Sequence, residues 1–125
     1  MKIRIRKVDK MFADYLKAKV GYRCERCKKQ YQKGDRAIQL SHFHGRRKES
    51  TRFEENNCSI LCFSCHNRFR EQPLEHTEWM KKRLGRKRFD LLTLQANTPK
   101  KKDDKMIEIY LNKLLETQNE KNNQL

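Results

Sequence analysis

The amino-acid sequence predicts a small domain of the α+β class with a helical extension at its C-terminal end. Three observations lead to this class: two Cys-x-x-Cys pairs, an alternating segment between them, and several segments in which apolar residues recur at helical spacing. With 125 residues, 35% of them hydrophobic, the chain can build one modest apolar core. A domain of this size often needs a cross-link or a bound metal as additional support.

The N-terminal part predicts one helix. Residues 2–6 alternate basic and apolar side chains, a pattern compatible with a short edge strand or with a basic arm. Asp9 is a typical N-cap residue, and the apolar positions after it fall at helical spacing: Met11, Phe12, Tyr15 and Leu16. We therefore expect a helix over residues 10–19 that ends near Gly21.

The central segment predicts a strand, a loop and a second helix. Residues 37–43 follow a polar turn, alternate in polarity and end before Gly45, so they predict a strand. The polar residues 46–55 have no period and predict a loop. Residues 60–69 predict a helix that carries the second cysteine pair.

The C-terminal part predicts three further helices. Pro73 marks a break, after which residues 74–84 and 86–95 predict two basic helices around Gly85. A linker with Pro99 and three lysines follows. Beyond it, an amphipathic stripe predicts another helix before a polar tail, 118–125, which we expect to be disordered; the stripe consists of Ile107, Tyr110, Leu111 and Leu114. We place the domain in residues 1–98, with 99–125 as linker, helix and tail.

The charge balance favours a nucleic-acid partner. The 31 Lys and Arg residues outnumber the 16 Asp and Glu residues and give a net charge of +15, more than solubility requires. A merely solvated basic surface is the alternative. No apolar run approaches the ~20 residues of a membrane span, and the charged N-terminus does not resemble a signal peptide. We therefore expect a cytoplasmic protein with no membrane partner.

The two cysteine pairs are the strongest single pattern in the chain. Cys24 and Cys27 form the first pair, and Cys62 and Cys65 form the second. Each spacing lets two sulfurs bind one tetrahedral ion at about 2.3 Å, so four thiolates predict a closed, structural Zn²⁺ site. A redox pair or unliganded buried cysteines are the alternatives. The fifth cysteine, Cys58, predicts a small buried side chain, unless it replaces one of the ligands.

Three polar residues lie in order inside this cysteine frame: His42, Asn57, and His66 directly after Cys65. With the frame, they resemble the signature of the HNH, or ββα-metal, endonucleases over residues 24–68. Four neighbouring segments are similar to phage HNH proteins of the NinG/Rap recombination nuclease group: Phe12-Ala13-Asp14-Tyr15, Ser41-His42-Phe43, Thr51-Arg52-Phe53 and Asn57-Cys58.

The resemblance implies a zinc-stapled ββα-metal core over residues 22–70, with 74–98 as a basic helical extension. It implies a hydrolase that cuts DNA by nicking or double-strand cleavage in phage or prophage recombination or processing. Hydrolysis of a phosphodiester needs a base for water and a cation for the developing charge. The resemblance gives these roles to His42, as general base, and to His66, as ligand of a catalytic Mg²⁺ or Mn²⁺.

The resemblance further implies that Asn57 positions the base, and Asn56 competes for that role. One position departs from the family pattern, because Ser41 precedes the base where these enzymes often have Asp or His. We expect the catalytic metal on His66, phosphate oxygens and water. Ser41 is a weak candidate ligand, and His44 is another because it would share a strand face with the base. His76 has no predicted role.

Basic residues near the presumed site predict salt-sensitive contacts with DNA phosphates. The candidates are Arg46, Arg47, Lys48, Arg68, Arg70, Arg86, Lys87 and Arg88. Arg52 has two equal interpretations, a DNA contact or an ion pair with Glu54 or Glu55.

Two other functions stay open at this point. A non-catalytic zinc-containing DNA-binding module needs the four cysteines but neither His42 nor His66. An accessory subunit could use the 106–115 stripe to dock a protein partner or a second copy. We favour the interpretation in which this stripe folds back on the core.

Overall fold

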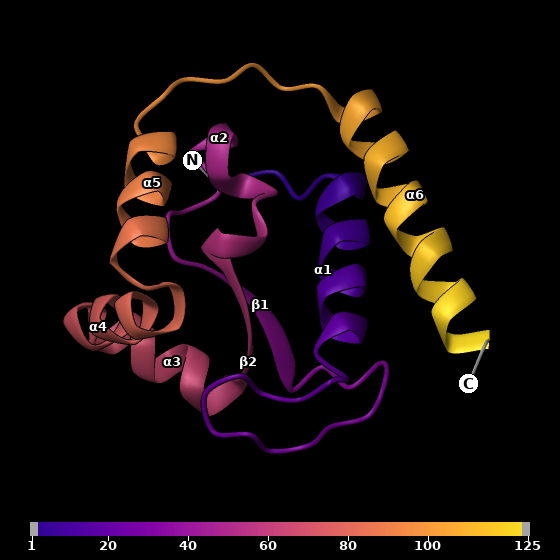
Figure 1. The fold of residues 1–125 in the computed structure, drawn as a ribbon. Helices are drawn as coiled ribbons and strands as arrows, with labels where there is room; N and C mark the ends of the chain where they lie inside the picture. Colours follow the sequence, from indigo (N-terminus) through magenta and orange to yellow (C-terminus); the bar gives the residue numbers. More distant parts are fainter. Residues whose placement is uncertain (1–2, 124–125) are drawn as a thin grey trace.

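The computed structural model describes residues 3–123. Its elements, in chain order, are α1 (Lys7–Lys19), β1 (Ile38–His42), α2 (Glu49–Arg52), the 3₁₀ turn η1 (Glu55–Asn57), β2 (Cys58–Cys62), α3 (Phe63–Glu71), α4 (Pro73–Leu84), α5 (Arg86–Ala96) and α6 (Asp104–Asn123). Figure 1 shows α1 and α6 side by side on one flank of the two strands, with α3, α4 and α5 on the other. The α+β class is therefore confirmed.

The two strands form one antiparallel ladder that separates two apolar clusters. Its register runs from Ile38 opposite Cys62 to His42 opposite Cys58. Because side chains alternate across a strand, one face of the sheet packs on α1 and the other faces α3 and α4. The α1 face forms the larger cluster, in which Phe12, Leu40 and Ile60 are buried.

The predicted helix over 60–69 is wrong in its first part. Residues 58–62 form β2, and the helix begins at Phe63. All five residues of β2 are buried, so the strand shows no polar alternation. A short apolar run of this kind cannot be assigned to strand or helix from periodicity alone. The result is a β1–β2–α3 order inside the cysteine frame.

The predicted loop over 46–55 is also wrong in part. It contains the single-turn helix α2, whose Thr51 and Arg52 are buried, and the start of η1. One turn is too short to show an apolar period, which explains the error.

The first helix begins earlier than predicted. It starts at Lys7, and Asp9 is its third residue rather than its N-cap. The Asp9 carboxylate accepts a hydrogen bond of 2.6 Å from the backbone N–H of Arg6, which is the N-cap. Residues 3–6 before it form no regular element, and residue 2 lies outside the described residues.

The C-terminal stripe folds back on the core, as predicted. The α6 helix packs on α1, and its Leu111 is 1% exposed within the larger cluster. The expected disorder of the tail is wrong for residues 118–123, which continue α6; residues 124–125 lie outside the described residues. Gln118 holds this part by donating a 3.1 Å hydrogen bond to the carbonyl of Tyr15. The two basic helices α4 and α5 are confirmed, and they meet at Gly85, whose φ is +78°.

Candidate functional site

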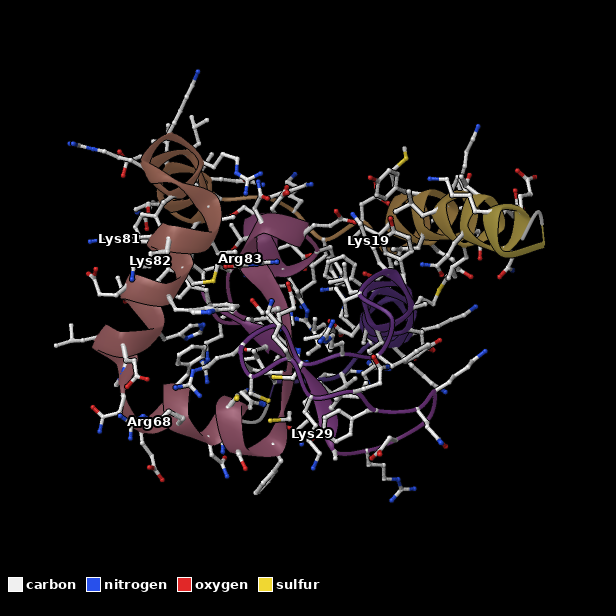
Figure 2. All side chains as sticks on the ribbon, turned by 60° about the horizontal axis from the view of Figure 1, so that its bottom comes forward. Lys19, Lys29, Arg68, Lys81, Lys82 and Arg83 are labelled. Atoms are coloured by element: carbon white, nitrogen blue, oxygen red, sulfur yellow. The ribbon has the colours of Figure 1, made fainter. Side chains whose placement is uncertain are left out.

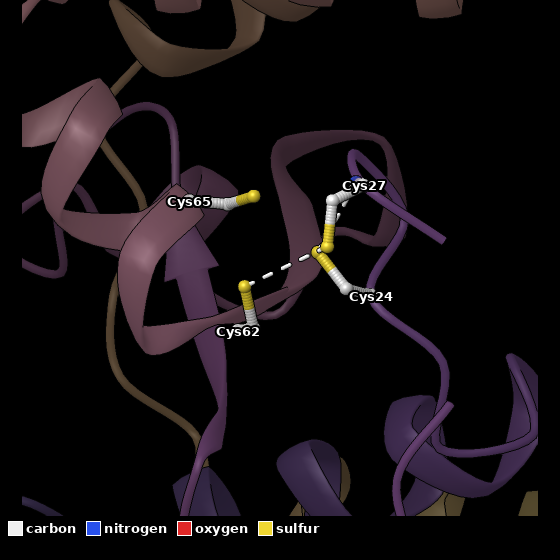
Figure 3. Close-up of side chains that lie close together, drawn as sticks. All are labelled: Cys24, Cys27, Cys62 and Cys65. Carbon is white, nitrogen blue, oxygen red and sulfur yellow. Dashed lines mark hydrogen bonds between the residues drawn. The ribbon is translucent and has the colours of Figure 1, made fainter. Parts of the chain in front are cut away.

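The four predicted thiolates meet at one end of the ladder. Cys24 and Cys27 come from the segment after α1, Cys62 ends β2, and Cys65 lies in α3 (Figure 3). Their sulfur atoms all lie within 4.8 Å of one another. The Sγ atoms of Cys27 and Cys62 are 3.8 Å apart, which matches the about 3.8 Å between sulfurs that tetrahedral coordination at about 2.3 Å requires.

The backbone around the first pair forms a tight knuckle. Cys24 donates a backbone hydrogen bond to Lys29 and accepts one from Lys28, at 3.0 and 2.9 Å. Lys28 has a φ of +69°, a conformation that reverses the chain directly after Cys27. This turn brings both sulfurs of the pair to the same side.

Local groups act differently on the thiols of this site: burial raises the pKa of Cys65, whereas the pKa of Cys24 is lowered. Burial acts to raise the pKa of the Cys24 thiol, but hydrogen bonds from the backbone amides of Cys27, Cys62 and Arg26 outweigh it and lower the pKa to about 7. The Arg26 guanidinium donates a 3.4 Å hydrogen bond to the Cys65 sulfur and pairs with Glu75 of α4 at 3.0 Å. The donor set and its surroundings therefore fit a structural Zn²⁺.

Cys58 lies outside this cluster. It starts β2 at the opposite end of the ladder and is 1% exposed, as expected of a small apolar side chain. Among residues 3–123, the four cysteines are the one group of three or more His, Cys, Asp or Glu side chains that could hold a metal ion. A second metal would therefore have to be bound by fewer than three such side chains.

His42 ends β1, at the end of the ladder opposite the cysteine cluster. Its Nε2 lies 2.9 Å from the backbone carbonyl of Arg52, so Nε2 carries the proton and Nδ1 keeps its lone pair. Burial, and then the charge of Arg46, lower the pKa of His42 to about 4. The imidazole is therefore neutral at neutral pH and can accept a proton on Nδ1.

Asn57 fixes the chain just after His42. Its side-chain oxygen accepts a hydrogen bond from the backbone N–H of His44, and its side-chain nitrogen donates to the carbonyl of His44, both at 2.8 Å. The same nitrogen also lies 3.1 Å from the carbonyl of Thr51. Asn57 is fully buried, whereas Asn56 is partly exposed, so the geometry favours Asn57 as the positioning residue.

The backbone carbonyl of Arg52 binds His42, and Arg52 itself is buried. Its side chain pairs with Asp9 rather than with Glu54 or Glu55, and its burial argues against a DNA contact. Its guanidinium makes two hydrogen bonds to the Asp9 carboxylate, of 2.9 and 2.6 Å, and both side chains are 4% exposed. It also donates to the carbonyls of Arg4 and Arg46, at 2.8 and 3.3 Å. Burial acts to raise the pKa of Asp9, but the bonds from Arg52 and from the Arg6 amide lower it.

His66 lies in α3 and faces the other side of the sheet. Its Nδ1 is 2.6 Å from the side-chain oxygen of Gln39, so Nδ1 donates and Nε2 is left as a possible metal ligand. Ser41 shares a strand face with Gln39 by alternation and is 4% exposed. Burial, and then the charges of Arg70 and Arg46, lower the pKa of His66.

Two other histidines surround this region. We predicted that His44 shares a strand face with His42, but β1 ends at His42 and the chain bends afterwards, so strand alternation does not apply to His44. The Nε2 of His44 is buried without a hydrogen-bond partner. Sequence reasoning gave His76 no role. Its ring stacks on Phe69 with centroids 4.4 Å apart, and burial followed by the charge of His66 lowers its pKa to about 4. Nothing in the sequence around His76 indicates this contact, because Phe69 belongs to another helix, α3.

The predicted DNA contacts divide into two groups. The first group lies near the two predicted catalytic histidines: Arg46, Arg47 and Lys48 are in the loop after His42, and Arg68 and Arg70 are on α3 with His66. The second group, Arg86, Lys87 and Arg88, begins α5. Arg68 pairs with Glu75 at 2.9 Å, and Arg88 donates to the carbonyl of Leu84 at the end of α4. Figure 2 shows Lys81 and Lys82 projecting from the outer side of α4, whereas Arg83 pairs inward with Glu25 at 3.1 Å.

No protein-family model, no curated protein and no solved structure matches this chain. The class that the fold and the site define is an α+β protein with four cysteines positioned to bind a metal ion. None of the helices in residues 3–123 combines the length and the apolar composition that crossing a bilayer requires.

Proposed function

We propose that this protein is a metal-dependent DNA endonuclease of the HNH type. The observation that carries the proposal is the order of the central elements. An antiparallel pair of strands leads into α3, with His42 at the end of β1 and His66 on α3. The buried Asn57 fixes the turn between them through the backbone of His44. The net charge of +15 suits a DNA substrate.

In the proposed reaction, His42 acts as the general base. Its Nδ1 accepts the proton of a water molecule while Nε2–H stays bound to the carbonyl of Arg52. The activated water attacks phosphorus, and the bond to the 3′ oxygen breaks. The divalent metal, when bound, supplies positive charge for the phosphorane and the leaving oxygen. Gln39 orients His66 so that its Nε2 is available to that metal. By strand alternation Gln39 and His42 lie on opposite faces of β1. The phosphate therefore has to reach both histidines around the end of the strand, where the charge of Arg46 acts on each of them.

The ligand set affects the choice of metal. His66 offers an imidazole, and the neighbouring Ser41 offers only a hydroxyl. Mg²⁺ prefers oxygen ligands and octahedral geometry, whereas imidazole suits transition metals better. Of the two expected metals, we therefore expect higher activity with Mn²⁺ than with Mg²⁺.

The test is nicking of supercoiled plasmid by the purified full chain in EDTA, Mg²⁺ and Mn²⁺. His42→Gln is the sharpest variant, because its amide nitrogen can still donate to the carbonyl of Arg52 while it offers no base. We expect a rate loss of about 10²–10⁴ with zinc content and melting temperature close to wild type. His66→Ala should lose activity that high Mn²⁺ partly restores. Equal cutting by wild type and His42→Gln would overturn the role of His42.

A second candidate is a non-catalytic zinc-containing DNA-binding module or accessory subunit. It is favoured by the absence of a second group of three metal-ligating side chains among residues 3–123. The same assay separates the two, because such a module binds duplex DNA but cuts it under no metal. Plasmid, linear duplex and a four-way junction offered side by side would test the further proposal of a phage role in recombination or processing.

A further inference from the structure

A basic cavity lies next to His42 and combines two predicted DNA contacts, Arg46 and Arg47, with cations that were not part of the predicted site. This cavity of about 820 Å³ is lined by the N-terminal arm, the loop after β1 and the segment before α6. Seven of its described lining residues are Arg or Lys and two are acidic. Three of the basic residues, Arg4, Arg6 and Lys102, come from segments far from the cysteine frame.

The carboxylates in and behind this cavity are paired with two of its arginines, Arg6 and Arg52. Arg6 pairs with both acidic lining residues, Glu49 and Asp104. The buried carboxylate behind it, Asp9, takes two hydrogen bonds from Arg52. Of the other cations of the cavity, Arg46 also reaches Asp9, at 4.0 Å, whereas Arg4 and Lys102 pair with none of these carboxylates.

Three groups are left to bind an anion. Among residues 3–123, the exposed side chains of Arg4 and Lys102 have no hydrogen-bond or ion-pair partner. The Nε of Arg46 is buried without a hydrogen-bond partner, because its nearest carboxylate, Asp9, lies 4.0 Å away and is occupied by Arg52. The Arg46 side chain is nevertheless 32% exposed, so the solvent-facing side of its guanidinium can donate to a phosphate oxygen.

The cavity adjoins the proposed catalytic group. Arg52 lines the cavity, and its backbone carbonyl accepts the hydrogen bond from His42. Arg46 also lines the cavity, and its charge lowers the pKa of His42. The volume is larger than one phosphate ion needs and falls within the usual range of ligand sites. A chain segment with a phosphate therefore fits better than a free ion.

We propose that this cavity binds a backbone phosphate of the DNA strand beside the phosphate on which His42 acts. The inference rests on the proposed function and adds a binding subsite built by Arg4, Arg46 and Lys102. The N-terminal arm and the segment before α6 then have a common task, which is to hold the substrate strand.

The test measures DNA binding by the full chain carrying His42→Gln, which prevents cutting. Fluorescence anisotropy with a labelled duplex in EDTA gives the affinity at several salt concentrations. The cavity variant adds Arg4→Gln and Lys102→Gln. The matched control adds Lys33→Gln and Lys113→Gln, two exposed cations that do not line the cavity.

We expect the cavity variant to lose about tenfold in affinity and to show a shallower salt dependence, by about 0.9 in slope for each lost phosphate contact. The control should lose less than about threefold. Equal losses in the two variants would overturn the cavity while leaving the DNA-binding function intact. If the parent protein does not bind DNA, the proposed function itself is wrong, and the subsite with it.

Discussion

The two ends of the β1–β2 ladder are held by different chemistry. At the end where Ile38 faces Cys62, four sulfurs converge and the nearby cluster has only five buried residues, three of them cysteines. At the end where His42 faces Cys58, an amide, an imidazole and a guanidinium bind backbone carbonyls. We call these the thiolate end and the polar end. We expect the thiolate end, and not the polar end, to depend on a bound metal for its cohesion.

The comparison also separates two roles for metal. Each strand has five residues, so the ends of the ladder are about 13 Å apart. A Zn²⁺ on the four cysteines is therefore too distant to act on water at His42, and four thiolates leave it no open position. We infer that zinc holds the scaffold, whereas the polar end carries the proposed general base. His66, the proposed ligand of the catalytic metal, contacts Gln39, one position from the thiolate end.

The largest effect is expected at the thiolate end. Cys62→Ser removes one of four ligands from a region with little apolar surface, so we expect loss of zinc and of the folded state. Cys58→Ser is the matched control, because its buried thiol lies on the same strand outside the cluster. Elemental analysis and circular dichroism measure both properties. Retention of one zinc per chain by Cys62→Ser would contradict the assignment.

The next effect concerns the buried ion pair behind His42. Asp9→Asn leaves the Arg52 guanidinium buried beside a neutral partner, which typically costs about 3–5 kcal/mol in the free energy of unfolding. The exposed Asp14 on the same helix provides the control, Asp14→Asn. Urea unfolding at saturating zinc is the measurement.

A double variant keeps this prediction testable if Asp9→Asn does not fold. Asp9→Asn with Arg52→Met removes the unpaired charge, so it should recover much of the lost stability. A double variant no more stable than Asp9→Asn alone would mean that the ion pair is not the cause.

A smaller effect is expected from the amide at the polar end. Asn57→Ala leaves the backbone groups of His44 without partners, which costs about 1–3 kcal/mol. Asn56→Ala should change the free energy of unfolding by much less, because its side chain is partly exposed. Urea unfolding compares the two. Zinc content should stay at one per chain in both variants, and equal destabilisation would remove the distinction between these two neighbours.

The same comparison explains what the sequence could reveal. The thiolate end was predictable because ligand spacing is a local property: the two Cys-x-x-Cys pairs define it without knowledge of the fold. The basic helices α4 and α5 were predictable because Pro73 and Gly85 mark their ends. The strand β2 was not, because its two faces are both buried and its short apolar run also fits a helix.

The supports of the polar end were less predictable. Asp9 and Arg52 are 43 positions apart, and only the fold brings them together. Each residue also had a plausible local interpretation, as an N-cap and as a partner of nearby glutamates. The cavity beside them likewise joins segments from both ends of the chain. The roles of His42, Asn57 and His66 stay predictions.

The smallest expected effect tests how the two ends respond to acid. Burial lowers the pKa of His76 to about 4, below the ordinary value of about 6.5 that it regains on unfolding. The unfolded chain therefore takes up this proton first, and the free energy of unfolding falls as the pH drops from about 7 towards 4. Zinc thiolates also weaken in acid, and at the polar end His42, whose pKa is likewise lowered to about 4, adds to the same decline. His76→Phe keeps the stacking on Phe69 but cannot take up the proton. Urea unfolding between pH 7.5 and 5.5, with zinc content measured at each pH, should show a shallower decline for His76→Phe. If the free energy of unfolding falls equally in wild type and His76→Phe, the acid sensitivity belongs to other groups, and the four cysteines are the first to test.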